Sequence, residues 1–146
     1  MGMEQTITQP RYVPPKTVGE LARQTTLGVL VAVVLALFVR GLASGVGVDL
    51  GPTGAGSPFA VVPLVMTTVV AGTGAAVAYT TLDRLTARPV RNFLTLGGLV
   101  FVGMMLPVVL FAPSLGVTPV GQVVLAVLHA VVAVPLVVFI VGLVRV

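Results

Sequence analysis

His129 is the only histidine of the chain, and it lies in the apolar run "LAVLHAVVAVPL", residues 125–136. An imidazole in such a position can relay protons, bind a metal ion or hold two helices together through a hydrogen bond. Gln122, Ala126 and Ala133 are spaced so that they share one stripe of a helix with His129. Two polar and two small residues on one stripe are typical of a helix–helix contact.

Thr67 and Thr68 lie at about the same depth as His129 in another apolar run. We therefore predict a hydrogen bond from His129 to Thr67 or Thr68, directly or through water. A structural role, in which this bond fixes how two helices pack, is our first interpretation; a proton or solute relay and the ligation of haem or a metal are the alternatives. One histidine with no cysteine and no buried carboxylate is a poor ligand set, so we expect no metal and no cofactor.

Charged residues at the edges of the apolar runs form two further candidate sites. Arg40 lies near the end of the first run, where its guanidinium can reach lipid headgroups, and Asp49 could pair with it. The alternative for Arg40 is an outer gate or a site that attracts anions. The segment "LDRLTARPVRNF", residues 82–93, places Arg84, Arg88 and Arg91 at one membrane surface, where we expect anionic headgroups as partners.

The composition indicates that most of the surface faces lipid. Charged residues make up 8% of the 146 residues and hydrophobic residues 57%, with a mean hydropathy of +1.15. A soluble domain carries about a quarter charged residues, so we predict an integral membrane protein. The net charge of +4 does not indicate nucleic-acid binding, because the basic residues lie between apolar runs rather than in one patch. No catalytic constellation is recognisable, and we expect no enzyme.

Four apolar runs are long enough to cross a bilayer core of about 30 Å as helices. They cover residues 25–43, 58–82, 93–112 and 119–143, approximately. Valine is frequent in all of them, but in lipid the backbone must satisfy its own hydrogen bonds, and four strands cannot close a barrel. The sequence therefore predicts an all-α fold, an integral membrane bundle of four antiparallel transmembrane helices.

The basic residues also predict an orientation. One set of connections and ends carries all of them except Arg40, namely Arg11, Lys16, Arg23, Arg84, Arg88, Arg91 and Arg145. The other two connections carry one charge, that of Asp49. By the positive-inside rule, both termini and the middle loop are expected in the cytoplasm.

Small residues predict where the helices approach each other closely. Glycine and alanine inside an apolar run let neighbouring backbones come together. The predicted packing positions are Gly72, Ala75, Ala76, Gly98, Gly103, Ala126 and Ala133.

The amino-terminal segment is predicted to be an arm followed by the start of a helix. Residues 1–17 form a proline-containing cytoplasmic arm, and residues 18–146 form the four-helix transmembrane domain. Thr17 and Glu20 have the spacing of a capping box, which predicts a helix start near Val18. The arm is either a solvated tail or a segment that docks on a partner.

Three motifs carry a resemblance to a known family. They are "TVVAGTGAAVA" and "DRLTARPVRNF", followed after a glycine-rich run by "VLAVLHAVVAVPLVV". Over residues 25–143 the chain resembles a family of small prokaryotic four-helix membrane proteins of unknown function. The resemblance implies a four-span fold, a multi-pass protein of the prokaryotic cell membrane, and His129 as a family feature. It implies no activity.

The function expected from these observations is that of a non-catalytic accessory or structural subunit of a larger membrane assembly. Its partners would be membrane lipids and either other membrane subunits or further copies of itself. One alternative is a small channel or transporter, formed by a single chain or by a homodimer, in which His129 lines the path. A membrane protein that binds a lipid or a quinone is a further alternative.

Overall fold

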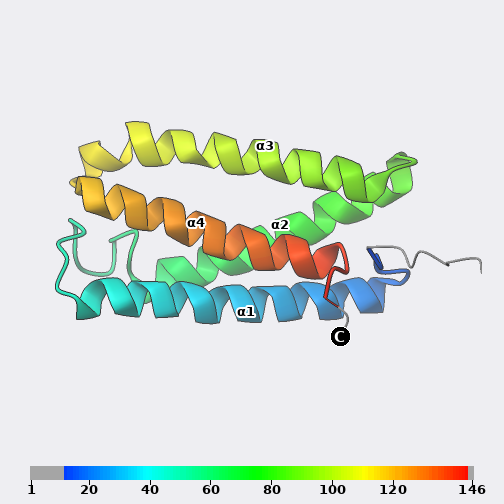
Figure 1. Ribbon diagram of the computed structural model, residues 1–146, viewed down its shortest axis with the longest axis horizontal. Helices are drawn as coiled ribbons and strands as arrows, with labels where there is room; N and C mark the ends of the chain where they lie inside the picture. Colours follow the sequence, from blue (N-terminus) through cyan, green and yellow to red (C-terminus); the bar gives the residue numbers. More distant parts are fainter. Residues whose placement is uncertain (1–11, 145–146) are drawn as a thin grey trace, which may run out of the picture.

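The computed structural model describes residues 12–144 and shows four long helices and one short one (Figure 1). The helices are α1 (Val18–Gly45), α2 (Val61–Leu85), α3 (Pro89–Leu110), the 3-10 helix η1 (Ala112–Leu115) and α4 (Pro119–Ile140). Within the described residues there is no strand. The all-α prediction is confirmed.

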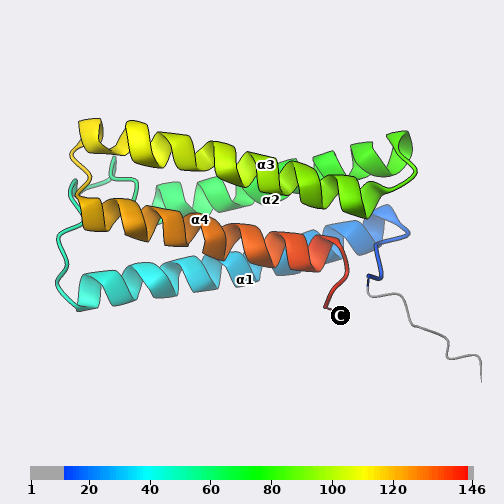
Figure 2. The same cartoon turned by 45° about the horizontal axis from the view of Figure 1, so that its top comes forward.

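Each of the four α-helices is long and apolar enough to cross a membrane. Their mean hydropathies over 18 residues lie between 1.9 and 2.9, so the chain is a multi-pass membrane protein. The helices alternate in direction, and the two described chain ends lie at the same end of the bundle (Figures 1 and 2). We name this end the terminal end and the opposite one the far end.

The helix bounds differ from the predicted spans by a few residues. The second helix begins at Val61 rather than at residue 58, because Ser57 to Ala60 form a turn in which the Ser57 hydroxyl accepts a hydrogen bond from Phe59 N at 3.1 Å. The third helix begins earlier, at Pro89, whose fixed φ suits a first helical position. The fourth ends at Ile140, followed by a turn at Gly142 with φ of +69°.

The predicted capping box at the start of α1 is confirmed. Thr17 Oγ1 accepts a hydrogen bond from Glu20 N at 3.1 Å, and Glu20 Oε2 accepts one from Thr17 N at 3.3 Å. Residues 12–17 then fold back onto the bundle, where Val13 N donates to Gly142 O at 3.2 Å. This part of the arm thus docks on its own chain. Residues 1–11 and 145–146, with the predicted topology signals Arg11 and Arg145, lie outside the described residues.

The most extensive helix pair is α1 with α4. Gly28, Ala32 and Ala36 of α1 are buried and repeat every four residues. A Cβ built on Gly28 would lie 3.3 Å from Phe139 Cβ, which shows how closely α4 approaches. Small residues at this spacing permit such an approach.

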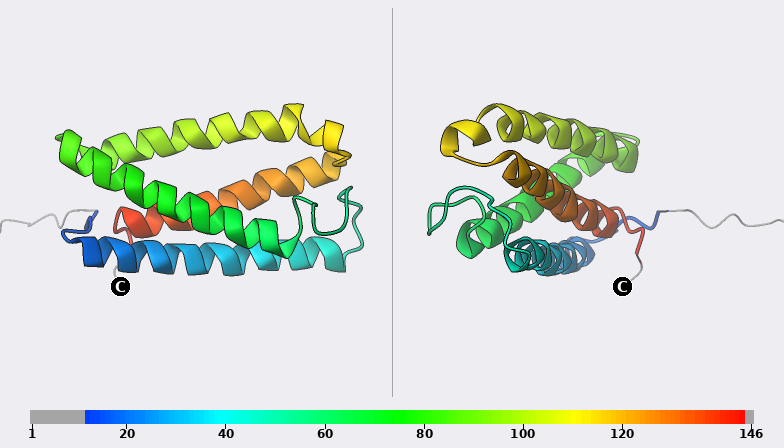
Figure 3. Two further views of the ribbon diagram at one scale, coloured as in Figure 1. Left: turned by 180° about the vertical axis from the view of Figure 1, so that it is seen from behind. Right: turned by 60° about the vertical axis from the view of Figure 1, so that its left-hand side comes forward.

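The third helix is attached at its two ends and open along its middle. Its buried residues are Phe93, near its start, and Val108, near its end. Phe93 packs edge to face against Tyr79 of α2, with ring centroids 5.5 Å apart. α3 does not approach α1, and α2 diverges from α3 away from their connection (Figure 3).

Candidate functional site

His129 is bonded within its own helix. Its Nδ1 lies 2.7 Å from Leu125 O, and since a carbonyl only accepts, Nδ1 carries the hydrogen. The hydroxyls of Thr67 and Thr68 donate to carbonyls of α2, at 2.8 Å to Pro63 O and at 2.7 Å to Leu64 O. The predicted direct bond between His129 and these threonines is therefore wrong. Each side chain is satisfied one turn earlier in its own helix, an option that threonine has in any helix.

Gln122, in the stripe that contains His129, reaches α3. Gln122 Nε2 donates to Val108 O at 2.8 Å and to Val109 O at 3.3 Å. These two carbonyls lack helical partners because α3 ends at Leu110, and Pro113 has no N–H to offer. At Gln122, the stripe is therefore in contact with α3.

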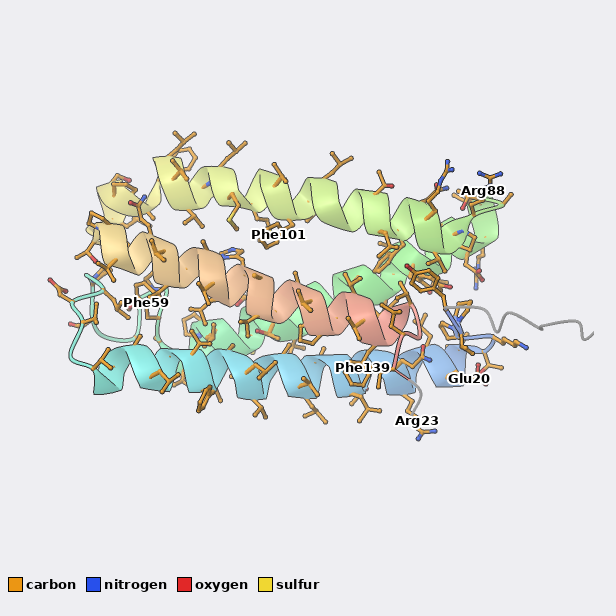
Figure 4. The ribbon with its side chains drawn as sticks, viewed as in Figure 1. Glu20, Arg23, Phe59, Arg88, Phe101 and Phe139 are labelled. Atoms are coloured by element: carbon orange, nitrogen blue, oxygen red, sulfur yellow. The ribbon has the colours of Figure 1, made fainter. Side chains whose placement is uncertain are left out.

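Ala133, on the same stripe, lines a groove between α3 and α4. The groove has a volume of about 470 Å³ and is lined by apolar side chains and glycine, among them Leu94, Gly97, Phe101, Ala130, Ala133 and Val137. Figure 4 shows Phe101 between the two helices. His129 directly precedes Ala130 in α4 and is not among the residues that line the groove. Ala126, also predicted to pack, is half-buried.

The predicted packing positions divide into two groups. Gly72 is buried, and a Cβ there would overlap Val29 Cγ2 and lie 3.3 Å from Leu136 Cδ2, which confirms close packing. Ala75 packs against the cluster around Tyr79, and Ala76 is half-buried.

Gly98 and Gly103 do not pack as predicted. Both are exposed, and a Cβ built on either one would meet no atom within 4 Å. The reason is that α3 is held only near its ends, so its glycines lie beside open space.

The predicted pair of Arg40 and Asp49 is replaced by two separate contacts. Arg40 Nε donates to Phe59 O at 2.6 Å, which ties α1 to the turn before α2. The Asp49 carboxylate accepts from Gly51 N at 2.9 Å. Both groups serve the connection between α1 and α2 at the far end.

The three arginines predicted to meet headgroups lie around the α2–α3 connection. Arg84, Arg88 and Arg91 are all exposed, and Arg88 is the N-cap residue of α3 (Figure 4). Their binding of anionic headgroups stays a prediction.

Sequence reasoning missed two features of the site. The first is the buried repeat Gly28, Ala32 and Ala36, whose signal was the small residue at every fourth position. The second is a set of buried polar atoms without a partner within the described residues, namely Gln24 Oε1, Thr25 Oγ1 and the Tyr79 hydroxyl. Among residues 12–144, no three histidine or acidic side chains gather into a group that could hold a metal ion.

Replacing His129 with leucine is expected to change the free energy of unfolding by less than about 1 kcal/mol, because the variant loses one hydrogen bond inside α4 and places an apolar group in an apolar span. Thermal unfolding in mild detergent, followed by circular dichroism, measures this change. A loss of more than about 3 kcal/mol, typical of a broken buried network, would show that the ring joins α4 to another element.

Comparison with known proteins gives one match. A family of unknown function, DUF6069, matches residues 16–145, which is nearly the whole chain. No curated protein and no solved structure matches.

Proposed function

The chain belongs to the DUF6069 family of unknown function, and from this premise we propose that it is a non-catalytic accessory or structural subunit of a larger assembly in the cell membrane. The family brings no activity with it. The proposal is supported by the surface that the bundle turns toward the bilayer.

The observation that carries the proposal is a stripe of small residues on the open side of α2. Thr67, Ala71, Gly74 and Thr81 repeat at helical spacing, and all four are exposed. A Cβ built on Gly74 would meet no atom within 4 Å. In a bilayer, small residues favour the close approach of another helix, whereas large aliphatic side chains suit contact with lipid. We name these four residues the α2 stripe and propose that a transmembrane helix of a partner protein packs against it.

The hydroxyl groups of the α2 stripe do not require a polar partner. Thr67 donates to Pro63 O at 2.8 Å and Thr81 donates to Val77 O at 2.9 Å, both within α2. The α2 stripe therefore consists of small side chains, and neither of its two hydroxyl groups is an unpaired donor. Such a surface favours close packing between helices over the passage of ions or water, which supports a subunit rather than a channel.

The proposed orientation places the terminal end in the cytoplasm. The exposed side chains of Arg23, Arg84, Arg88 and Arg91 lie at or near this end, in agreement with the positive-inside rule. The far end then carries the two other connections between the helices, with Arg40 and Asp49 beside one of them.

Replacing Gly74 with leucine tests the proposal. The tagged protein is extracted from its native membrane in mild detergent and weighed by native mass spectrometry. The unchanged chain is expected to carry another membrane subunit at fixed stoichiometry. The Gly74→Leu variant is expected to bind that subunit at least about tenfold more weakly, which corresponds to about 1.4 kcal/mol of binding free energy. Val69→Leu, at an exposed position on another face of α2, is the matched control and should keep the partner.

Two results would contradict the proposal. One is a chain that leaves its native membrane as a lone monomer or as a clean homo-oligomer. The other is a Gly74→Leu variant that retains its partner, which would show that the partner does not pack against the α2 stripe.

A further inference from the structure

The groove between α3 and α4 owes its existence to how α3 is attached. At the terminal end, Phe93 holds α3 against Tyr79, and at the far end the Gln122 amide holds the last carbonyls of α3. Between these two attachments, Gly97 and Gly98 supply no side chain to fill the space. The groove is therefore bounded at both ends, and Gly98 and Val134 on its rim are exposed to the surroundings.

We propose that this groove binds one acyl chain of an anionic phospholipid, whose phosphate lies on Arg88 and Arg91. The site lies on α3 and α4, away from the α2 stripe, and goes beyond the proposed role as a subunit.

The shape and lining of the groove favour an acyl chain. Every lining residue is apolar or glycine, which suits a hydrocarbon and offers nothing to a polar ligand. A transmembrane helix, about 10 Å across, is too wide to enter between α3 and α4, which are tied together at both ends. A flexible, thin chain can enter from the open rim at Gly98 and Val134.

The charge at the terminal end favours an anionic headgroup. Leu94 begins the groove three residues after Arg91, about 4.5 Å along the helix axis. Arg88, labelled in Figure 4, lies one turn earlier, at the N-cap of α3. Both arginine side chains are exposed. A lipid phosphate at the membrane surface can therefore meet two guanidinium groups while its acyl chain reaches toward Phe101.

A single tryptophan at Phe101 tests the proposal, because the chain has no tryptophan of its own. The Phe101→Trp protein is placed in phosphatidylcholine vesicles containing a small fraction of a lipid with brominated acyl chains, which quench indole fluorescence on contact. We expect brominated phosphatidylglycerol to quench half-maximally at a mole fraction at least fivefold below that of brominated phosphatidylcholine, since one arginine at the surface contributes about that factor. Replacing Arg88 and Arg91 with glutamine should abolish the difference.

Leu99→Trp is the matched control, because Leu99 is two residues from Phe101, exposed and absent from the groove lining. It should be quenched alike by both lipids. An equal preference for phosphatidylglycerol at Leu99→Trp and Phe101→Trp would indicate general enrichment around the protein and overturn the proposal. Equal quenching by both lipids at Phe101→Trp would also overturn it, as would a preference that survives the loss of both arginines.

A second measurement keeps the proposal testable if the tryptophan variant fails to fold. Native mass spectrometry of the unchanged chain should show one retained phosphatidylglycerol more often than one phosphatidylcholine from an equal mixture. Gly98→Leu should reduce this retention although both arginines remain, because the leucine occupies the groove. A dimer without retained lipid would assign the groove to a second copy and overturn the proposal. Since Gly98 is outside the α2 stripe, loss of lipid and loss of a partner subunit are separate outcomes.

Discussion

Replacing Gly72 with leucine is expected to lower the free energy of unfolding of the bundle by about 3 kcal/mol or more, at the upper end of the range for overpacked interiors. A Cβ on Gly72 would overlap Val29 Cγ2 of α1 and lie 3.3 Å from Leu136 Cδ2 of α4. Valine has few rotamers because its Cβ is branched, so Val29 cannot turn away. Three helices meet at this glycine, and a larger side chain must push them apart. Thermal unfolding in mild detergent, followed by circular dichroism, measures the loss.

Gly74→Leu is the matched control for this result. Gly74 lies on the same helix, is exposed, and has no atom within 4 Å of its Cβ position. Leucine is a better helix former than glycine by roughly 1 kcal/mol, so this variant is expected to keep or slightly raise the stability of the isolated chain. Equal losses from both variants would show that leucine disturbs α2 itself, and would refute the close contact of the three helices at Gly72.

Shortening Val29 to alanine in the Gly72→Leu background provides an independent check. If the overlap with Val29 causes the loss, this second change should recover part of it, and the two substitutions should be coupled by about 1 kcal/mol or more. Additive effects would place the cause elsewhere, for example at Leu136.

The existence of the four helices could be predicted because the thickness of the bilayer sets their length. A run of about 20 apolar residues has one stable form in lipid, a helix that satisfies its own backbone. The start of α1 was also predictable, because the capping box of Thr17 and Glu20 depends only on residues within one turn. Those features need no knowledge of what lies next to the helix.

The packing face of each helix could not be predicted in the same way. In water, an apolar stripe on a polar helix reveals the buried side, but here both the buried and the lipid-facing sides are apolar. Gly72 and Gly103 therefore carry the same signal in the sequence, although Gly72 is buried and Gly103 is exposed. The small residues of α1 at positions 28, 32 and 36 are buried, and Gly28 lies against Phe139 of α4.

The polar contacts were hard to predict for a related reason. His129 and Thr68 do lie in transmembrane helices, but depth alone does not say which way a side chain points. Each of them finds a carbonyl one turn earlier in its own helix, so neither needs the other. The rotation of α4 is shown by Gln122, which reaches the unpaired carbonyls at the end of α3. That end depends on where α3 stops, a boundary that the sequence predicts only to within a few residues.

Replacing Gly51 with alanine is expected to lower the free energy of unfolding by about 3 kcal/mol or more. Gly51 has a φ of +106°, a left-handed conformation that costs an L side chain roughly 1–2 kcal/mol. Its Cβ would also overlap the Gly116 carbonyl oxygen and lie 2.9 Å from Val117 Cα, and backbone atoms cannot rotate away as a side chain can. Overpacking of this kind costs about 1–3 kcal/mol.

The overpacking cost of Gly51→Ala arises because the α1–α2 and α3–α4 connections are hydrogen-bonded to each other beside Gly51. Thr118 N donates to Leu50 O at 3.3 Å, and Thr118 Oγ1 donates to Asp49 O at 2.7 Å. Gly54→Ala is the matched control, because Gly54 also has a positive φ, +91°, but no atom lies within 4 Å of its Cβ position. This control should show the conformational cost alone, and limited proteolysis should cut the α1–α2 connection faster only in Gly51→Ala. Equal losses of stability and equal proteolysis for the two variants would mean that the connections at the far end do not press on each other at Gly51.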